Sequence, residues 1–330
     1  MIRPLLLVAV LGTSPGYELS AAGSTDVLAD TVTADHYRIY TGEGQPVSWE
    51  ELVSHLLDAD VVFIGENHND PVAHYIEQAV LGAALADESR RTAASMEMFT
   101  RDVQYIVDEY LHDMISEDHF RRSSTPWRNY EVDYRPFVEM AKEAGAAVIA
   151  ANAPRRYANR VTRMGPESVQ DLSDAARKYL APLPYSGASD AYRAEWDAVM
   201  AEAMAGMMQQ TDSSAAEGED SLAEGSGGSQ HNYAMGYALD AQSLWDATMA
   251  FSIADHLTRN PGSQVVHIVG GFHVQNGTGI PEHFQRYRPG SSRVIIAVEP
   301  VEDIATFDHG VHHGLGDFVI LGDASLPRSY

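Results

Sequence analysis

The sequence has no cysteine, only two lysines, and no long apolar run after its amino-terminal segment. Without cysteine, disulfide bonds, thiolate nucleophiles, zinc fingers and iron–sulfur clusters are excluded. A membrane helix needs about 18 consecutive apolar residues, so we expect no membrane-spanning segment in the mature protein. The 22 basic residues, among them the lysines Lys142 and Lys178, stand against 47 acidic residues, for a net charge of -25. This charge argues against nucleic acid or an anionic membrane surface as a partner.

The amino terminus has the pattern of a secretion signal. Arg3 supplies a positive charge, Leu5 to Leu11 form an apolar stretch, and Ser20-Ala-Ala22 is a small-x-small cleavage site. We therefore expect residues 1–22 to be a signal peptide and residues 23–35 to be a mobile lead-in. The expected location is periplasmic or secreted.

Two distant segments share the order strand, glycine, two residues, histidine. In Val61-Val-Phe-Ile-Gly65-Glu-Asn-His68 the apolar residues predict a buried strand, and Gly65 predicts a sharp turn after it. Val265-Val-His-Ile-Val269 and Gly270-Gly-Phe-His273 repeat this order, with the histidines 205 positions apart (273 minus 68). Asp70-Pro71 predicts the cap and first residue of a helix after the first motif. Each motif should therefore place a histidine just beyond the carboxyl end of a strand.

Apolar segments alternate with helical patterns, which predicts an α/β fold with a mainly parallel sheet and helices on both faces. The segment between Asn152 and Val265 is too long for one crossover, so we expect an inserted helical subdomain at about residues 166–259. Residues 211–229, rich in Ser, Gly, Ala and acid, predict a disordered acidic loop. We assign residues 36–330 to this one α/β domain.

Four predicted strands end in polar residues, and the carboxyl ends of parallel strands share one edge, where ligands bind. The residues at these ends are Glu66 and His68, Glu97 and then Arg101, Asn152 and then Arg155, and His273. We predict that they form one site.

This set of residues leaves three kinds of chemistry open. Imidazoles and carboxylates can hold Zn²⁺ with a position open for water, which predicts metal-assisted hydrolysis with Arg101 holding an anionic group. The predicted metal ligands are Glu66, His68, Glu97 and His273, and together with Arg101 they are the predicted catalytic residues. Without metal, a His–Glu pair could activate water directly. Alternatively, the same groups could hold a large ligand without turnover.

The motifs, in their order along the chain, resemble the ChaN-like haem-binding uptake proteins of the Tiki superfamily. They are GENH, EMFTRDVQ, W-x-x-Y-x-x-D-Y-x-P (Trp127 to Pro136), ANAPRR, the helix around Asp246-Ala-Thr-Met-Ala250, and VGGFHVQNGTGIP. The resemblance spans roughly Asp60 to Pro281, and the positions matching the superfamily signature are Gly65, His68, Glu97, Gly270 and His273.

The resemblance implies an EreA/ChaN-like α/β core with a helical subdomain, an envelope location in bacteria, and haem binding for iron acquisition. More distant superfamily members with the paired GxxH motifs are metal-dependent peptidases, and erythromycin-esterase-like hydrolases share the fold. Many relatives are lipoproteins anchored by an amino-terminal cysteine. Because this chain has no cysteine, we expect it to be free in the periplasm or exported.

Haem requires an apolar slot, an axial ligand to the iron and cations for its propionates. The predicted haem-contacting residues are His68, Arg101, Asn152, Arg155 and His273, with Tyr185, Tyr192 and His231 as further candidates around the helical subdomain. Our first interpretation is thus a haem-binding periplasmic or secreted protein for iron uptake. A metal-dependent hydrolase of peptidase or esterase type is the alternative, and a purely structural envelope protein is a third. The expected partner is haem or another small molecule, and the sequence leaves a homodimer open.

Overall fold

The computed structural model describes residues 32–201 and 236–330. The predicted signal peptide, most of the lead-in, the acidic loop and His231 lie outside these residues. Among the described residues, no helix combines the length and the apolar character that crossing a bilayer would require.

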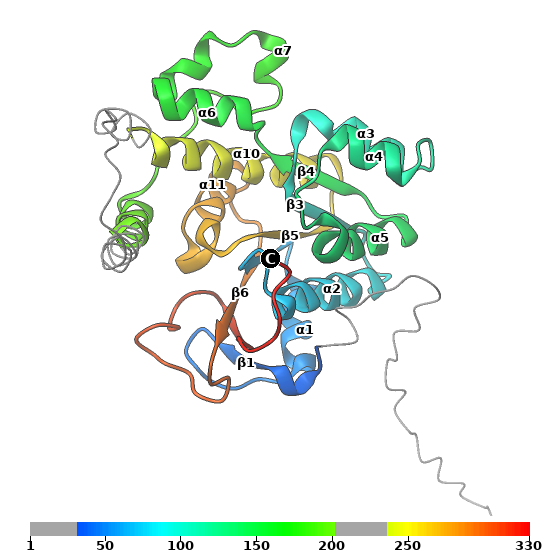
Figure 1. The fold of residues 1–330 in the computed structure, drawn as a ribbon, viewed down its shortest axis with the longest axis vertical. Coiled ribbons are helices and arrows are strands. Elements are labelled where there is room, and N and C mark those ends of the chain that lie inside the picture. Colours follow the sequence, from blue (N-terminus) through cyan, green and yellow to red (C-terminus); the bar gives the residue numbers. More distant parts are fainter. Residues whose placement is uncertain (1–31, 202–235) are drawn as a thin grey trace, which may run out of the picture.

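A seven-stranded sheet lies at the centre of the fold, in the order β1-β7-β6-β2-β5-β3-β4 (Figure 1). Six strands run parallel, and β1 pairs with β7 in the antiparallel direction at one edge. The prediction of an α/β fold with a mainly parallel sheet is therefore confirmed. The strands are β1 (Tyr37–Thr41), β2 (Val61–Glu66), β3 (Thr92–Thr100), β4 (Val148–Asn152), β5 (Gln264–Gly270), β6 (Arg293–Val301) and β7 (Phe318–Asp323).

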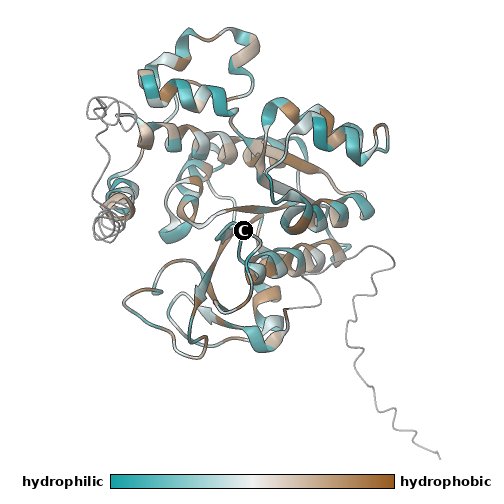
Figure 2. Ribbon diagram, viewed as in Figure 1, coloured by the Kyte–Doolittle hydropathy of each residue, from teal (hydrophilic) through white to brown (hydrophobic). Residues whose placement is uncertain are grey.

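Helices cover both faces of the sheet because successive residues of each strand point to opposite sides. In β2, Val62 and Ile64 belong to one apolar core, whereas Val61 and Phe63 belong to the other. Figure 2 shows the resulting brown, apolar strands and the mixed colours of the helices around them. The first core is covered by α1 (Trp49–Asp58), α2 (Pro71–Ala86), α3 (Gln104–Leu111), α4 (Glu117–Ser124) and α5 (Arg135–Glu143). The second is covered by α10 (Ala238–Arg259) and α11 (Ile280–Tyr287).

The helical region after β4 contains α6 (Arg155–Met164), a 3-10 turn (Pro166–Asp171), α7 (Asp174–Arg177) and a helical segment at 190–201. It shares α10 with the α/β core. Ala241 and Leu244, near the start of α10, pack in a small cluster with residues of α6. Met249 and Ile253, further along the same helix, pack in the second core against the sheet. One helix thus connects the helical region to the centre of the fold.

The helix after the first motif begins as predicted. Asp70 caps α2, its Oδ1 accepting a hydrogen bond from the backbone N–H of Val72 at 3.0 Å, and Pro71 is the first helical residue. The interpretation of Gly65 was wrong, because Gly65 lies inside β2 and not in a turn. Glycine is required there by close packing. A Cβ atom on Gly65 would lie 2.8 Å from Val274 Cγ2 and 3.0 Å from Gly271 Cα.

Gly65→Ala should lower the free energy of unfolding by about 1–3 kcal/mol, because the added methyl group would overpack a closed core. Gly82→Ala is the matched control. Gly82 lies inside α2, its added Cβ would meet only Met140 Sδ at an ordinary 3.7 Å, and alanine favours a helix interior. We expect this control to raise stability by about 0.5–1 kcal/mol in urea denaturation. Equal effects of the two substitutions would contradict the packing account.

Candidate functional site

The four strands with predicted polar ends, β2, β5, β3 and β4, are consecutive neighbours in the sheet and run parallel. Their carboxyl ends therefore lie side by side. Glu66 and Asn152 are the last residues of β2 and β4, Glu97 lies in the second half of β3, and His273 ends a 3-10 turn directly after β5. The structure thus places these side chains at the same edge of the sheet, as the sequence predicted.

The imidazole of His68 is oriented by a buried carboxylate. His68 Nδ1 donates to Glu66 Oε1 at 2.9 Å, and the hydroxyl of Tyr134 donates to the same oxygen at 2.7 Å. The ring of His68 also packs edge-on against Trp127, with 4.8 Å between centroids. Burial alone would lower the pKa of His68, but the hydrogen bond to Glu66 and the charges of Glu66 and Glu97 raise it above 6.5. A third of the side chain, 34%, remains exposed, so His68 can contact a ligand.

The second histidine has a carboxylate partner of its own, which comes from α10. His273 Nδ1 lies 2.5 Å from Asp246 Oδ1, and both residues are buried. Burial would lower the pKa of His273, but the charge of Asp246, its hydrogen bond and the charge of Glu97 raise it to about 9. Tyr192 packs beside His273 and Asp246. Its buried ring stacks on Phe272, and burial together with the charge of Asp246 raises the pKa of its hydroxyl.

Glu97 lies between the two histidines. Its Oε2 accepts a hydrogen bond from the backbone N–H of Gly270 at 2.9 Å, and its Oε1 lies 3.9 Å from His273 Nε2. Glycine at position 270 permits this arrangement, because a Cβ there would lie 3.0 Å from His68 Nε2 and 3.6 Å from Glu97 Oε2. Both histidines have a carboxylate on Nδ1, which is how proteins commonly orient imidazoles that bind a metal through Nε2.

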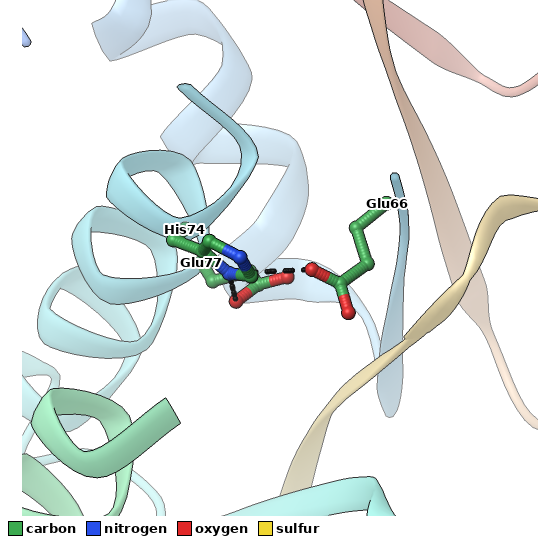
Figure 3. A group of neighbouring side chains, drawn as sticks. All are labelled: Glu66, His74 and Glu77. Atoms are coloured by element: carbon green, nitrogen blue, oxygen red, sulfur yellow. Dashed lines mark hydrogen bonds and ion pairs between the residues drawn. The ribbon is translucent and has the colours of Figure 1, made fainter. Parts of the chain in front are cut away.

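Glu66 also belongs to an enclosed polar cluster with His74 and Glu77 (Figure 3). Asp133 lies at its edge, 3.7 Å from His74 Nε2. Within the described part of the chain, Glu66, His74 and Glu77 are the one group of three whose possible metal-ligand atoms all lie within 4.8 Å of one another. Burial lowers the pKa of His74, but the charges of Glu66 and Glu77 outweigh it and raise the pKa to about 10. Burial and the charge of Glu66 raise the pKa of Glu77 well above its usual value. The predicted metal set of Glu66, His68, Glu97 and His273 is not drawn together as closely.

A cleft of about 680 Å³ opens at the strand ends beside Glu97 and Asn152. Its other lining residues include the apolar Met98, Pro126, Trp127 and Pro154 and the basic Arg128, Arg155 and Arg156. The guanidinium of Arg155 lies 5.6 Å from the ring centroid of Trp127, and that of Arg128 lies 4.3 Å from the ring of Tyr330. Arg156 pairs with Asp102, whereas no described carboxylate lies within 4 Å of a guanidinium nitrogen of Arg128 or Arg155. The cleft therefore offers two available cations in a strongly acidic protein.

Two predicted site residues point elsewhere. Arg101 donates to Ser252 Oγ at 2.6 Å and lies over the ring of Phe251, so it contacts α10 and does not line the cleft. Tyr185 donates to the backbone carbonyl of Asp240 at 3.0 Å and packs in the small cluster of the helical region. Arg101 thus contacts the later part of α10 and Tyr185 its first turn, placements that depend on the path of the helical region.

Several residues at this edge were not predicted from the sequence as site residues. They are His74, Glu77, Arg128, Asp133, Tyr134, Asp246 and Tyr330. A usable signal existed for three of them. Asp246 is a charged residue on the buried side of a helix, and His74 and Glu77 are three positions apart among the buried apolar residues of α2.

Comparisons with known proteins identify the family and support the fold. The model of a family described as "Haem-binding uptake, Tiki superfamily, ChaN" matches residues 52–284. A solved structure of ChaN from Campylobacter jejuni, described as showing cofacial haem binding, is similar in fold. The identity is 15% and the TM-score 0.62, over 88% of this chain and 98% of that chain. A mutant of the erythromycin esterase EreC in its open conformation matches at 12% identity and a TM-score of 0.44, over 80% of this chain and 77% of that one. No curated protein matches the chain.

Replacing Asp246 should destabilise the protein in a pH-dependent way. The folded pKa of His273, about 9, exceeds its usual 6.5, so the stabilisation is fully present below about pH 6.5 and is lost as the pH rises through about 9. In urea denaturation with a chelator present, we expect Asp246→Asn to lower the free energy of unfolding by about 3 kcal/mol at pH 6 and by less at pH 10.

Asp255→Asn is the control for this measurement. Asp255 lies on the same helix, where it pairs with Arg259 at the surface, so its loss should change stability by less than about 0.5 kcal/mol at either pH. An equal loss for Asp246→Asn at the two pH values would contradict the pairing of His273 with Asp246.

Proposed function

Because this chain belongs to the haem-binding uptake family of the Tiki superfamily, ChaN, we propose that it binds haem in the cleft beside Glu97. The observation that carries this proposal is the pair of available arginines, Arg128 and Arg155, at a cleft whose mixed lining includes the apolar Met98, Trp127 and Pro154, in a chain of net charge -25. A cationic position in such a chain favours an anionic ligand. The haem-binding description of the Campylobacter jejuni protein supports the same ligand class.

The residues of the cleft fit the requirements of haem. A porphyrin ring needs an apolar surface, which Met98, Trp127 and Pro154 supply, and its propionates need cations, which Arg128 and Arg155 supply. His68 is the proposed axial ligand, because Glu66 holds its Nδ1 while part of the ring stays exposed beside Trp127. When bound, haem would supply the iron that is the cargo of an uptake protein.

The role in iron uptake and the location form part of the same proposal. The secretion-signal pattern of residues 1–22 supports a periplasmic or secreted protein. In that location, a haem-binding cleft would serve to acquire or hold haem iron outside the cytoplasm.

Ferric haem titrated into the purified protein should shift the Soret band and saturate. Arg128→Ala combined with Arg155→Ala should weaken the affinity at least tenfold, about 1.4 kcal/mol, because both propionate partners are removed. His68→Ala should change the position of the Soret maximum, since an axial ligand is lost. Arg38→Ala is the control. Arg38 is an exposed arginine on β1, the edge strand opposite β4, so its loss should change neither the haem affinity nor the Soret maximum. A wild-type spectrum without any Soret shift would refute the proposal.

A second candidate function is metal-dependent hydrolysis. It is favoured by one observation, namely that His68 and His273 each have a carboxylate on Nδ1 and lie beside Glu97. In this alternative His68 and His273 would hold Zn²⁺ at the carboxyl edge of the sheet, and Glu97 beside them would act as a ligand or general base.

This alternative requires that the protein binds zinc and also hydrolyses a substrate. Zinc content should fall in His273→Ala, and hydrolysis of a panel of ester and peptide substrates should fall at least a hundredfold in Glu97→Gln, the loss of a general base being worth about 10²–10⁴-fold. If the wild type hydrolyses none of the panel while it binds haem, the hydrolase alternative fails and the haem proposal stands.

A further inference from the structure

We propose a second binding site, enclosed within the fold and separate from the cleft, in which Glu66, His74 and Glu77 bind a divalent transition-metal ion such as Zn²⁺. Figure 3 shows His74 and Glu77 projecting from α2 toward Glu66, which comes from the end of β2. His74 and Glu77 are three residues apart and therefore lie on the same face of the helix. Two neighbouring elements of the core thus direct one imidazole and two carboxylates to a single point.

The distances suit ligands that share an ion. His74 Nδ1 lies 3.2 Å from Glu66 Oε2 and 3.2 Å from Glu77 Oε2. Hydrogen bonds between charged groups are usually shorter, about 2.7–2.9 Å. Two ligands that are each about 2.1 Å from a tetrahedral Zn²⁺ lie about 3.4 Å apart, which is close to the observed separations. All three ligand atoms lie within 4.8 Å of one another, so the side chains can share an ion that would replace the hydrogen bond between His74 and Glu77.

Several buried atoms of the cluster have no hydrogen-bond partner within the described chain. Glu66 Oε2, Glu77 Oε1 and His74 Nε2 accept or donate no hydrogen bond there, although these side chains are at most 1% exposed. Each buried polar atom without a partner is unfavourable by about 1–3 kcal/mol. An ion held between the three side chains would give Glu66 Oε2 and Glu77 Oε1 a partner, since His74 Nδ1 lies 3.2 Å from Glu66 Oε2 but makes no hydrogen bond to it.

The cluster holds more acidic than basic side chains. Glu66, Glu77 and Asp133 surround the single imidazole of His74, and no described arginine or lysine nitrogen lies within 4 Å of any of these carboxylates. Asp133 is placed as an outer partner, with its Oδ2 3.7 Å from His74 Nε2. A carboxylate on the second ring nitrogen is the usual means of orienting an imidazole that binds a metal.

The donor set selects the class of ion. Mg²⁺ and Ca²⁺ prefer oxygen ligands and retain water or high coordination numbers, so an enclosed site with an imidazole does not suit them. One nitrogen and two carboxylate oxygens suit Zn²⁺, Mn²⁺ or Fe²⁺, among which Zn²⁺ binds most tightly in a given site. Because Glu66 also holds His68, an ion bound here would fix the position of this histidine, which packs on Trp127 of the cleft.

The test measures bound zinc in the His273→Ala variant, because this substitution removes one of the two histidines that would hold zinc in the hydrolase alternative. The full chain carrying His273→Ala is incubated with excess ZnCl₂, desalted, and analysed by native mass spectrometry and elemental analysis. We expect about one tightly held Zn²⁺ per chain. Adding Glu77→Gln, which keeps the side-chain size, or His74→Gln should lower the zinc affinity at least tenfold, since each removes a ligand. X-ray absorption should show nitrogen and oxygen donors.

Glu139→Gln in the same His273→Ala background is the matched control, because Glu139 is a half-buried glutamate that pairs with Tyr110 outside the cluster. It should retain the zinc. Circular dichroism and haem titration of the Glu77→Gln protein verify that its fold and cleft persist. The proposal is overturned if the His273→Ala protein holds no zinc, which would mean that protons alone occupy the cluster, or if Glu77→Gln and His74→Gln retain the ion. Neither outcome affects the haem proposal, which depends on the Soret band.

Discussion

The buried carboxylate of Glu66 is the constraint on which the rest of the site depends. One of its oxygens accepts hydrogen bonds from His68 and Tyr134, and the other faces His74. A carboxylate this deeply enclosed persists in its charged form because positive and hydrogen-bonding partners surround it. Burial would raise the pKa of Glu66, but the charge of His74 and the hydrogen bond from His68 lower it. The same carboxylate therefore holds His68 through one oxygen and belongs to the enclosed cluster through the other.

The order of the strands explains why residues so far apart in sequence meet here. β5 lies between β2 and β3, so the second motif, which comes late in the chain, is placed between two strands that come earlier in the sequence. His273, which follows β5, then lies 3.9 Å from Glu97 of the adjacent β3, and His68, which follows β2, is near enough for the charge of Glu97 to raise its pKa. The missing side chain of Gly270 leaves room for His68 and Glu97 to approach.

Much of the fold was predictable from the sequence because its signals are local. Apolar runs indicated the strands, Asp70-Pro71 indicated the start of a helix, and the polar ends of parallel strands indicated the edge where the site lies. The strand order and the path of α10 depend on contacts between distant residues, which the sequence pattern does not encode. For that reason the partner of His273, Asp246, was missed, and Arg101 was assigned to a cleft that it does not line. The enclosed cluster was missed because His74 and Glu77 lie within a helix that otherwise has an ordinary apolar face.

The shared helix α10 has a mechanical consequence. Its early turns pack in the helical region and its later turns pack on the sheet, while Asp246, between them, holds His273. Because α10 packs against both regions, we expect a displacement of the helical region to tilt α10 and to move Asp246 and the imidazole of His273 with it. The position of the outer helices would thereby affect the position of His273 inside the site.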